Sequence, residues 1–181
     1  MKNTLVARVD PSLKSTWEWF QFQKELVTEA FAHALESTSP TVRSTPRPYD
    51  GRFLAREPAW IKTFFARQVE ELELLASFEM IATVEAILRL DIGQRVTKRL
   101  KDPVSQQFRR VTFDRARLDE DILEIWKQEA GVNVSDFRSA LKLRHWLAHG
   151  RHWHPKLGRG FKADEIYLVS SELLAAIRPL N

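Results

Sequence analysis

A long helical pattern in the middle of the chain constrains the fold more than any other feature of the sequence. It begins at Pro58 and runs to about Asp91, and Gly93 just beyond it is a helix stop signal. Since strand-like alternation persists nowhere along the chain, the pattern predicts an all-α bundle built on this helix. Its inner, core-facing stripe includes Leu74, Phe78, Ile81 and Leu88.

Apolar residues at helical spacing predict further helices, which gives a bundle of about five. The first of them has Asp10 as its cap and Pro11 at its first position. The helix that follows Gly131 has Ser135 and Asp136 available as caps. The predicted helices cover about 10–35, 115–130, 135–149 and 163–177.

The chain of 181 residues is long enough for one substantial core. Residues 37–52 are rich in Pro, Ser and Thr and predict an exposed linker. The chain therefore divides into an N-terminal helix with its linker, 1–57, and a helical domain, 58–181. Within that domain, 95–110 is expected to continue the preceding helix and then to form a loop.

Composition excludes several classes of protein. Apolar residues make up 44% of the chain and charged residues 29%, a balance typical of globular proteins and not of disordered chains. The absence of Cys excludes disulfides, thiolate metal sites and a cysteine nucleophile. The sequence contains no long apolar run that would span a membrane and no secretory signal at "MKNTLVARVDPS". These features predict a cytoplasmic protein with no membrane partner.

The positive charge is unevenly placed, although the net charge is only +4. Not one Asp or Glu occurs within 138–163. Arg151, Lys156 and Arg159 in this acid-free stretch are expected to bind the backbone of a nucleic acid. A second basic run covers 95–110.

Arg144 interrupts the apolar stripe of the helix predicted over 135–149. A guanidinium cannot shed its charge, so it must meet an acid, line a cleft or bind an anion. Glu85 interrupts the stripe of the long helix in the same way. A pair between Glu85 and Arg144 is the simplest expectation, either as part of a site or as a purely structural ion pair, and Glu79 is the alternative acid.

Four of the five histidines lie in the stretch "LKLRHWLAHGRHWHP". His145 and His149 are four residues apart, so they project from one side of the helix, about 40° from each other. Imidazoles suit proton transfer near neutral pH, and the nearby Arg144 would stabilise negative charge on a phosphorane. This combination predicts phosphodiester cleavage.

Metal binding is the rival chemistry, because His145 and His149 are followed by His152 and His154. The pattern lacks the Glu that zinc hydrolases place next to the first His, and the neighbouring arginines would repel a dication. The sequence therefore predicts neither a metal nor another cofactor, and His152 and His154 are expected to be ordinary surface residues.

The residues "LRHWLAHGRHW" resemble the R-x4-H signature of the HEPN superfamily, compact helical domains named for higher eukaryotes and prokaryotes nucleotide-binding. Arg144 matches the motif Arg and His149 the motif His. His145 matches the polar position after the Arg, where Asn is more usual. The resemblance covers about 58–177 and implies a HEPN-like fold.

Many HEPN proteins are metal-independent endoribonucleases, often toxins of toxin and antitoxin pairs or effectors of antiviral defence. For this chain the resemblance implies that His149 acts as base or acid on the ribose 2′-hydroxyl or the leaving oxygen, while Arg144 holds the scissile phosphate. Members commonly dimerise so that two motifs face each other across a shared cleft. The implied partners are therefore RNA, a second copy of the chain, and an antitoxin or regulatory protein.

Two alternatives to the endoribonuclease remain at this point. In the first, the same pocket binds a nucleotide or a protein without catalysis, as in other members of the superfamily. In the second, the chain is a purely structural helical protein. The tryptophans leave a similar choice, since Trp146 or Trp153 would either stack on a base or simply pack against neighbouring side chains.

Overall fold

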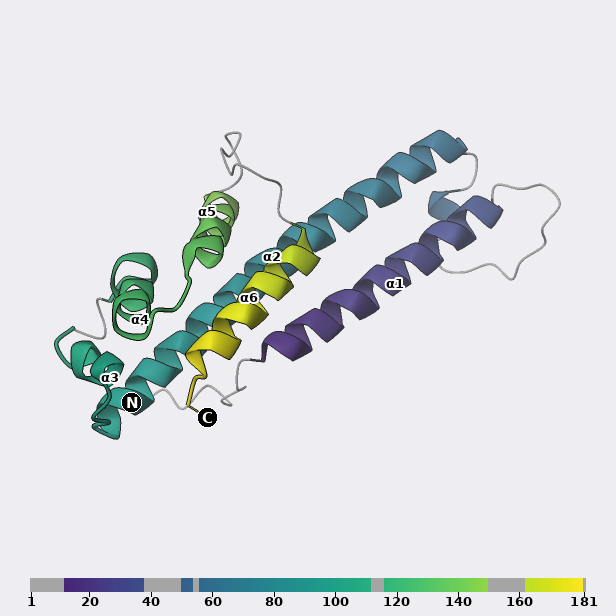
Figure 1. The fold of residues 1–181 in the computed structure, drawn as a ribbon. Helices are drawn as coiled ribbons and strands as arrows, with labels where there is room; N and C mark the ends of the chain where they lie inside the picture. The colour runs from purple at the N-terminus through teal and green to yellow at the C-terminus, as the bar shows by residue number, and fades with distance from the viewer. Residues whose placement is uncertain (1–11, 38–49, 54–55, 112–115, 150–161, 181) are drawn as a thin grey trace, which may run out of the picture.

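The computed structural model describes residues 12–37, 50–53, 56–111, 116–149 and 162–180, which form an all-α bundle (Figure 1). The predicted fold class is thus confirmed, and the described ranges contain no strand. None of the described helices combines the length and apolar character needed to cross a membrane. The elements are α1 (Leu13–Ser37), the 3-10 turn η1 (Asp50–Arg52), α2 (Pro58–Thr97), α3 (Pro103–Phe108), the π-helical turn η3 (Leu118–Ile122), α4 (Leu123–Ala130), α5 (Ser135–Ala148) and α6 (Ala163–Ile177).

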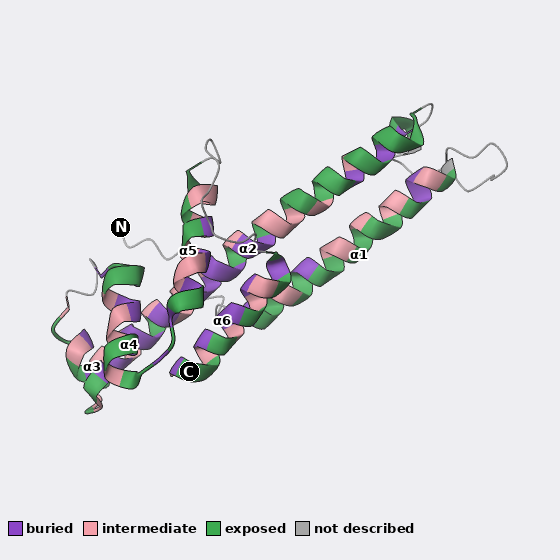
Figure 2. Cartoon of the chain, turned by 45° about the horizontal axis from the view of Figure 1, so that its top comes forward, coloured by how far each residue is buried: buried purple, intermediate pink, exposed green. Residues whose placement is uncertain are grey.

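The helix α2 is the spine of the bundle and packs against α1, α3, α5 and α6. α1 runs antiparallel along it, α6 lies against both, and α3 to α5 cover the opposite side of α2 (Figure 1). Figure 2 shows the buried residues on the sides of these helices that face one another. Met80, Ile81, Val84 and Leu88 of α2 have no exposed surface. The pattern over 58–91 therefore does mark the centre of the fold.

Two hydrophobic cores form along the pair of α1 and α2. The main core takes residues from all the α-helices, including Leu13 and Phe20 near the start of α1. The second core is formed by buried residues of α1, α2 and the turn after η1, at the end of the pair that extends beyond the other helices (Figure 2). This second core consists of Ala34, Phe53, Ile61 and Phe65. The α1 helix thus contributes to both cores. The division of the chain into 1–57 and 58–181 stays a prediction.

Glu73 of α2 links α1 and α6 to the spine. Its Oε1 accepts a hydrogen bond from Lys24 Nζ at 2.9 Å, and its Oε2 accepts one from the backbone N–H of Ala163 at 3.0 Å. The first N–H groups of a helix have no partner within the helix. Glu73 therefore caps α6, which spans the predicted 163–177, from a neighbouring helix.

Gly93 does not stop the long helix, so the predicted end near Asp91 is wrong. α2 continues to Thr97, whose Oγ1 donates to the carbonyl of Gly93 at 2.7 Å. Ile92 is buried beside the glycine, and Val96 packs against the main core. Burial of these apolar side chains outweighs the cost of Gly within a helix, which is about 1 kcal/mol relative to Ala.

The end of α2 is a Schellman turn with Arg99 in the left-handed region at φ 49°. The N–H of Arg99 donates to the carbonyl of Val96 at 3.2 Å, and that of Leu100 donates to the carbonyl of Arg95 at 3.3 Å. Glycine is favoured at this position because a side chain there costs about 1 kcal/mol. Arg99 therefore makes the turn less stable than glycine would.

A buried ion pair fixes this end of α2. Asp91 is fully buried, and its carboxylate accepts hydrogen bonds from Arg95 Nε and from the N–H of Leu180, both at 2.8 Å. The guanidinium of Arg95 also lies 3.6 Å from the carboxylate of Asp102 and 4.8 Å from the ring centroid of Trp126. These contacts join α2 to α3, to α4 and to the residues after α6.

The helix α3 occupies part of the segment that was expected to be a loop, so the prediction for 95–110 is wrong there. Asp102 caps it by accepting hydrogen bonds from the N–H of Ser105 at 2.9 Å and from its hydroxyl at 2.6 Å, and Pro103 takes the first position. Burial raises the pKa of Asp102, but the hydrogen bonds from Ser105 and the charge of Arg95 lower it by more. The Asp-Pro pair is the same start signal that predicted the first helix.

The N-cap residue of α5 is Val134, which makes no side-chain capping hydrogen bond, so the prediction of Ser135 or Asp136 is wrong. The Oδ1 atom of Asn133 accepts hydrogen bonds from the N–H and the hydroxyl of Ser135, at 3.1 and 2.7 Å. Ser135 is already the first residue of the helix. The preceding helix, α4, ends as predicted at Gly131, which adopts φ 66°.

Two predictions for the N-terminal part lie outside the described residues. They are the cap at Asp10 with Pro11, and most of the linker 37–52. Within the described part of the linker the turn η1 forms. At the start of α1, the hydroxyl of Ser12 accepts a hydrogen bond from the N–H of Ser15 at 3.2 Å, so Ser12 serves as a cap.

Candidate functional site

Arg144 of α5 pairs with Glu85 of α2, as the two interrupted stripes predicted. Its Nη2 atom lies 2.8 Å from Glu85 Oε2. The side chain of Arg144 is 36% exposed and that of Glu85 is 16% exposed, so one edge of the guanidinium still faces solvent. Glu79, the alternative acid, is exposed and lines a different hollow, with Trp19 of α1.

A second arginine shares the carboxylate of Glu85. Arg89, one turn further along α2, donates from Nε and Nη2 to Glu85 Oε1 at 3.0 and 2.9 Å. Its Nη1 donates to the carbonyl of Ala116 at 3.1 Å. Two guanidinium groups thus flank one carboxylate, which leaves the cluster with a net positive charge.

One donor of Arg144 remains unsatisfied. Its Nε is buried and has no hydrogen-bond partner among the described residues. A buried donor without a partner costs about 1–3 kcal/mol. The unpaired Nε therefore offsets part of the stabilisation that the ion pair with Glu85 provides.

The two imidazoles at the end of α5 contact each other. The ring centroids of His145 and His149 lie 4.2 Å apart, with the ring planes inclined at 59°. Both residues are exposed, and the N–H of His149, at the C-cap, donates to the carbonyl of His145 at 3.1 Å. The predicted pairing of the two rings on one side of the helix is confirmed. Two adjacent imidazoles in solvent can both donate and accept protons near neutral pH.

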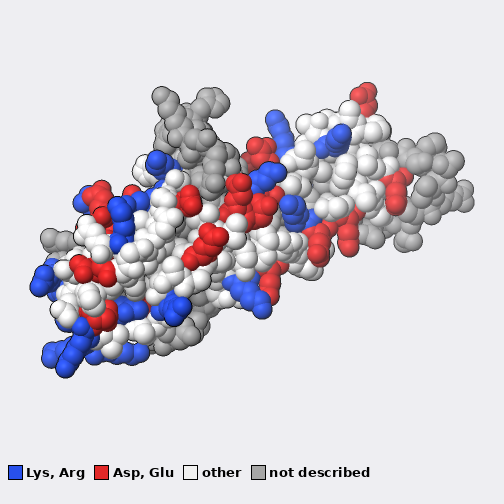
Figure 3. All heavy atoms as spheres, viewed as in Figure 1, with Lys and Arg blue, Asp and Glu red and all other residues white. Residues whose placement is uncertain are grey.

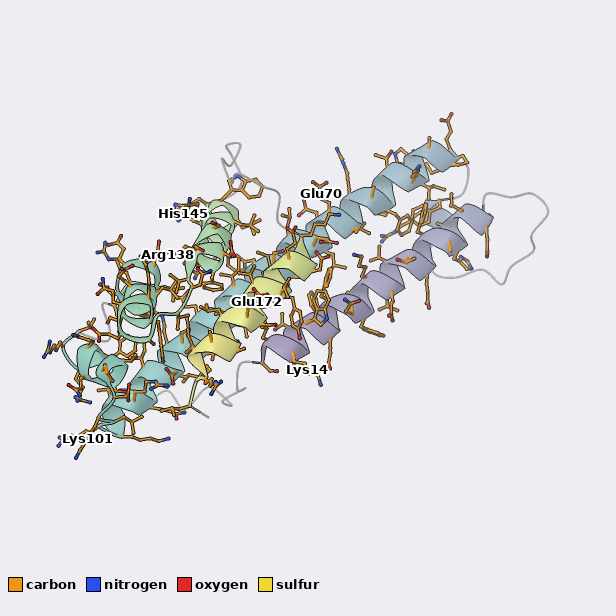
Figure 4. The ribbon with its side chains drawn as sticks, viewed as in Figure 1. Lys14, Glu70, Lys101, Arg138, His145 and Glu172 are labelled. Carbon is orange, nitrogen blue, oxygen red and sulfur yellow. The ribbon has the colours of Figure 1, made fainter. Side chains whose placement is uncertain are left out.

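Arg144 and His149 point in different directions from α5. Their five-residue separation places them about 140° apart around the helix axis. Arg144 points toward Glu85 on α2, whereas Figure 4 shows His145 on the outer side of α5, away from α2. A single protomer therefore presents the guanidinium and the imidazoles on different sides of one helix end.

The histidines instead share a side of α5 with two cations. Arg138, Lys142, His145 and His149 are separated by four, three and four residues, so they lie within about 60° of arc. Arg138 and Lys142 line a hollow between α5 and α4, together with Lys127. The side of α5 that carries the imidazoles therefore also carries two basic side chains.

Arg138 is held by acids of the neighbouring elements. Its guanidinium pairs with Asp119 of η3 and with Glu124 of α4, whose Oε2 it contacts at 2.6 Å. The hydrogen bond to Glu124 raises the pKa of Arg138 and, together with the hydrogen bond from Gln128, lowers the pKa of Glu124. These pairs neutralise Arg138, so Lys142 is the cation of this side nearest to the histidines along the chain.

An apolar hollow lies next to the histidines, between α2 and the end of α5. Glu71 stands at its polar rim, and its apolar wall includes Phe78 and Ala148, the residue before His149. Phe78 is half-buried here, so this part of the predicted inner stripe faces the hollow and not the centre of the core. The remaining lining residues are Leu74, Leu75 and Leu147.

Several predicted site residues cannot be placed. Arg151, Lys156 and Arg159 lie outside the described residues, as do His152, His154 and Trp153. Trp146 is described, and it packs against the main core, which favours the packing role for this side chain. Within the described ranges, no three His, Asp or Glu side chains are grouped as a metal site requires.

The sequence analysis missed Arg89, and it placed Lys142 only in the acid-free basic stretch without linking it to the histidines. Arg89 braces Glu85, and its signal was the four-residue spacing from that glutamate on the same helix face. Lys142 lies on the side of the histidines, and its three-residue spacing from His145 was the signal. Both signals concern spacing within one helix, so they are available without knowledge of the fold.

A double-mutant cycle is expected to show that the pair of Glu85 and Arg144 contributes to stability. We expect Glu85→Gln and Arg144→Gln to have a coupling free energy of about 1 kcal/mol, because the pair is only partly screened by solvent. Urea unfolding of both single variants and the double variant measures this coupling. Additive effects of the two substitutions would contradict the prediction and would mean that Glu85 does not hold Arg144.

No model of a known protein family matches the chain, and no curated protein or solved structure matches it. The resemblance to the HEPN superfamily therefore rests on the motif residues themselves, Arg144, His145 and His149.

Proposed function

We propose that the chain is a metal-independent endoribonuclease that cleaves RNA through attack of the ribose 2′-hydroxyl on the adjacent phosphate. The observation that carries the proposal is the contact between the imidazoles of His145 and His149, 4.2 Å apart and open to solvent at the end of α5. Transfer of two protons is what this reaction requires from a catalyst. Arg144, anchored by Glu85 on another side of α5, supplies a fixed positive charge.

The proposed roles follow from the chemistry of transesterification. The oxygen of the 2′-hydroxyl forms a bond to phosphorus while the bond to the 5′ oxygen breaks. His149 takes the proton of the hydroxyl, and His145 gives a proton to the departing oxygen. The products are a 2′,3′-cyclic phosphate and a free 5′-hydroxyl. Because the attacking group is the 2′-hydroxyl, DNA is not a substrate.

The proposed active form is a homodimer. Arg144 and His149 diverge by about 140° around α5, so one protomer does not direct both at one phosphate from the same side. In a symmetric dimer, the guanidinium of one protomer and the imidazole of its partner can face a shared cleft. The commonly dimeric state of HEPN proteins supports this part of the proposal.

The resemblance also supports a biological setting for the activity. We place the chain among cytoplasmic toxins or antiviral defence effectors, with an antitoxin or a regulatory protein as a further partner. Such an enzyme slows growth when it is expressed without its partner. Relief of toxicity by His149→Ala would support this setting, whereas equal growth with wild-type and variant protein would count against it.

A cleavage assay tests the activity directly. Purified protein is incubated with bulk RNA and transfer RNA in the presence of EDTA, and DNA of matching sequence serves as the control. We expect RNA fragments that end in a 2′,3′-cyclic phosphate and intact DNA. RNA that remains intact after long incubation would contradict the proposal.

A second candidate is a non-catalytic module that binds a nucleotide or a protein. The observation in its favour is the engagement of Arg144 with Glu85, which commits part of the guanidinium to the fold. This candidate predicts saturable binding without turnover. Calorimetric titration with a dinucleoside monophosphate, followed by chromatography of the recovered ligand, separates the two, because only the nuclease converts it to product.

A further inference from the structure

Five basic side chains form a patch at the end of α2 and around α3, in the second basic run of the sequence. All five are exposed. Figure 3 shows basic side chains gathered at this end of the molecule, and Figure 4 places Lys101 there, apart from His145 at the end of α5. The residues of this α3 basic patch are Lys98, Arg99, Lys101, Arg109 and Arg110.

None of these five cations forms an ion pair within the part of the chain that the structure describes. Lys98 and Arg110 contact the neutral side chains of glutamines, at 3.2 and 3.4 Å. Arg109 donates to the carbonyl of Leu100 at 2.7 Å. Asp102, the acid in their midst, is already used by Ser105 and Arg95. The positive charge of the patch is therefore not neutralised by neighbouring acids.

The cations of the nearby α4 region behave differently. Arg117 pairs with Glu120, Lys127 lies 3.7 Å from Glu124, and Arg138 pairs with Asp119 and Glu124. The cations of the α4 region thus have acidic partners. In the α3 basic patch, five neighbouring cations have none among the described residues, and their mutual repulsion favours a ligand that supplies negative charge.

The patch is built on a rigid support. Three contacts of neighbouring residues fix the turn that carries the patch. Asp91 forms a buried ion pair with Arg95, Arg95 stacks on Trp126, and Asp102 caps α3. A surface held in one conformation loses little entropy when a ligand binds. The cations are therefore presented in a fixed arrangement and not on a loose tail.

Arg99 occupies the left-handed position of the Schellman turn, at φ 49°, where glycine is favoured. Arg178 after α6 has the same φ, so this backbone conformation does not by itself mark a functional surface. A cation near the end of a helix offsets the helix dipole, but Lys101 gains nothing from this effect, because it lies just before the positive N-terminal end of α3.

We infer that the α3 basic patch binds the phosphodiester backbone of RNA, outside the cleavage site. No large exposed apolar side chain of the described residues lies within 98–110, so the patch lacks the anchors of a membrane surface and the apolar centre of a protein interface. Guanidinium groups match phosphate in geometry, and a row of phosphates releases counterions when it binds several cations.

The position of the patch indicates its role for the proposed nuclease. Glu85, which holds Arg144, and Lys98 are separated by roughly 20 Å along α2 and its end. A dinucleotide at the histidines would not span this distance, whereas a longer RNA would. The inference takes RNA as the ligand from the proposed function but does not depend on cleavage.

Binding of RNA by full-length protein tests the inference. The parent is the His149→Ala variant, which keeps RNA intact, and the probe is a fluorescein-labelled single-stranded RNA followed by anisotropy at several salt concentrations. In this background, Lys98, Arg99, Lys101 and Arg110 are replaced with Gln, and Arg109 is retained because it bonds to Leu100. We expect affinity for RNA to fall about tenfold or more. The plot of log affinity against log salt concentration should become shallower, with its slope smaller in magnitude by about 2 to 3.

A matched control removes the same charge elsewhere. It replaces four exposed cations on α1, η1 and the first half of α2 with Gln, and we expect less than about a threefold change in affinity. Equal losses in patch and control variants would overturn the inference, as would unchanged binding by the patch variant. The control residues are Lys14, Arg52, Lys62 and Arg67.

A single substitution separates binding from folding. Arg99→Gly relieves the left-handed backbone, so we expect the Tm to rise while affinity for RNA falls about twofold to fivefold. Arg178 also has φ 49°, and Arg178→Gly is the matched control, with a raised Tm and unchanged affinity. If Arg99→Gly binds RNA as tightly as its parent, the inference is wrong.

Two further outcomes distinguish failure of the proposed nuclease activity from failure of the inference about RNA binding. If the parent binds RNA through the patch but wild-type protein never cleaves it, the proposed nuclease fails and the inference stands. If wild-type protein binds vesicles of phosphatidylcholine and phosphatidylglycerol through the patch but does not bind RNA, the inference is overturned in favour of a membrane surface.

Discussion

Replacement of His149 with alanine is expected to slow RNA cleavage by about 10²- to 10⁴-fold, the usual contribution of a general acid or base. The variant should fold normally, because His149 is exposed at the end of α5 and lies outside both cores. Initial rates of RNA cleavage in EDTA measure the first effect, and the Tm measures the second.

Two variants purified in parallel control for contaminating nuclease and for the role of the neighbouring ring. Gln68→Ala alters an exposed residue in the first half of α2 and should cleave at the wild-type rate. His145→Asn introduces the residue that is more usual in HEPN proteins but removes the proposed proton donor to the departing oxygen, so it should also slow cleavage by about 10²- to 10⁴-fold. Cleavage by His149→Ala at the wild-type rate would remove His149 from the mechanism.

Replacement of Asp91 with alanine is expected to lower the free energy of unfolding by about 3–5 kcal/mol. The carboxylate is fully buried, and its loss leaves the guanidinium of Arg95 and the N–H of Leu180 without their main partner. Single domains are stable by only about 5–15 kcal/mol, so this loss is large. Urea unfolding followed by circular dichroism measures it.

The double replacement of Asp91 by Leu and Arg95 by Met distinguishes the cause. Removing both charges avoids an unpaired ion in the core, so we expect the double variant to be more stable than Asp91→Ala. A destabilisation by Asp91→Ala of less than about 1 kcal/mol would show that water or another group replaces the carboxylate.

The pairing of Glu85 with Arg144 could be predicted from the sequence because it depends on a simple constraint. Each residue interrupts an apolar stripe, and charged groups on two packed helix faces must meet or face a cleft. The contact of His145 with His149 was predictable for a similar reason, since a four-residue spacing determines which side chains share one side of a helix.

The sequence analysis placed a stop at Gly93 and a helical continuation from residue 95, so it did not predict one uninterrupted α2. Local helix propensity favours a stop at glycine, but the residues after it are held by packing against helices that come later in the chain. The ion pairs of Arg138 also depend on the tertiary fold, because Asp119 is separated from it by 19 residues and belongs to another element.

The start of α3 was predictable and was missed. Asp102 and Pro103 form the same signal as Asp10 and Pro11, but Gly93, Pro103 and the weak periodicity of the segment were interpreted as signs of a loop. The divergence of Arg144 and His149 also follows from their spacing alone.

The two separate cores along α2 affect how the molecule unfolds. The outer core of Ala34, Phe53, Ile61 and Phe65 is small and is stabilised by α1, α2 and the turn between them alone. We therefore expect this end to open transiently while the remaining helices stay packed, since regions with fewer buried contacts open at lower free energy. Native-state amide exchange should then be faster for residues near Ile61 than for residues near Val84, although both belong to α2.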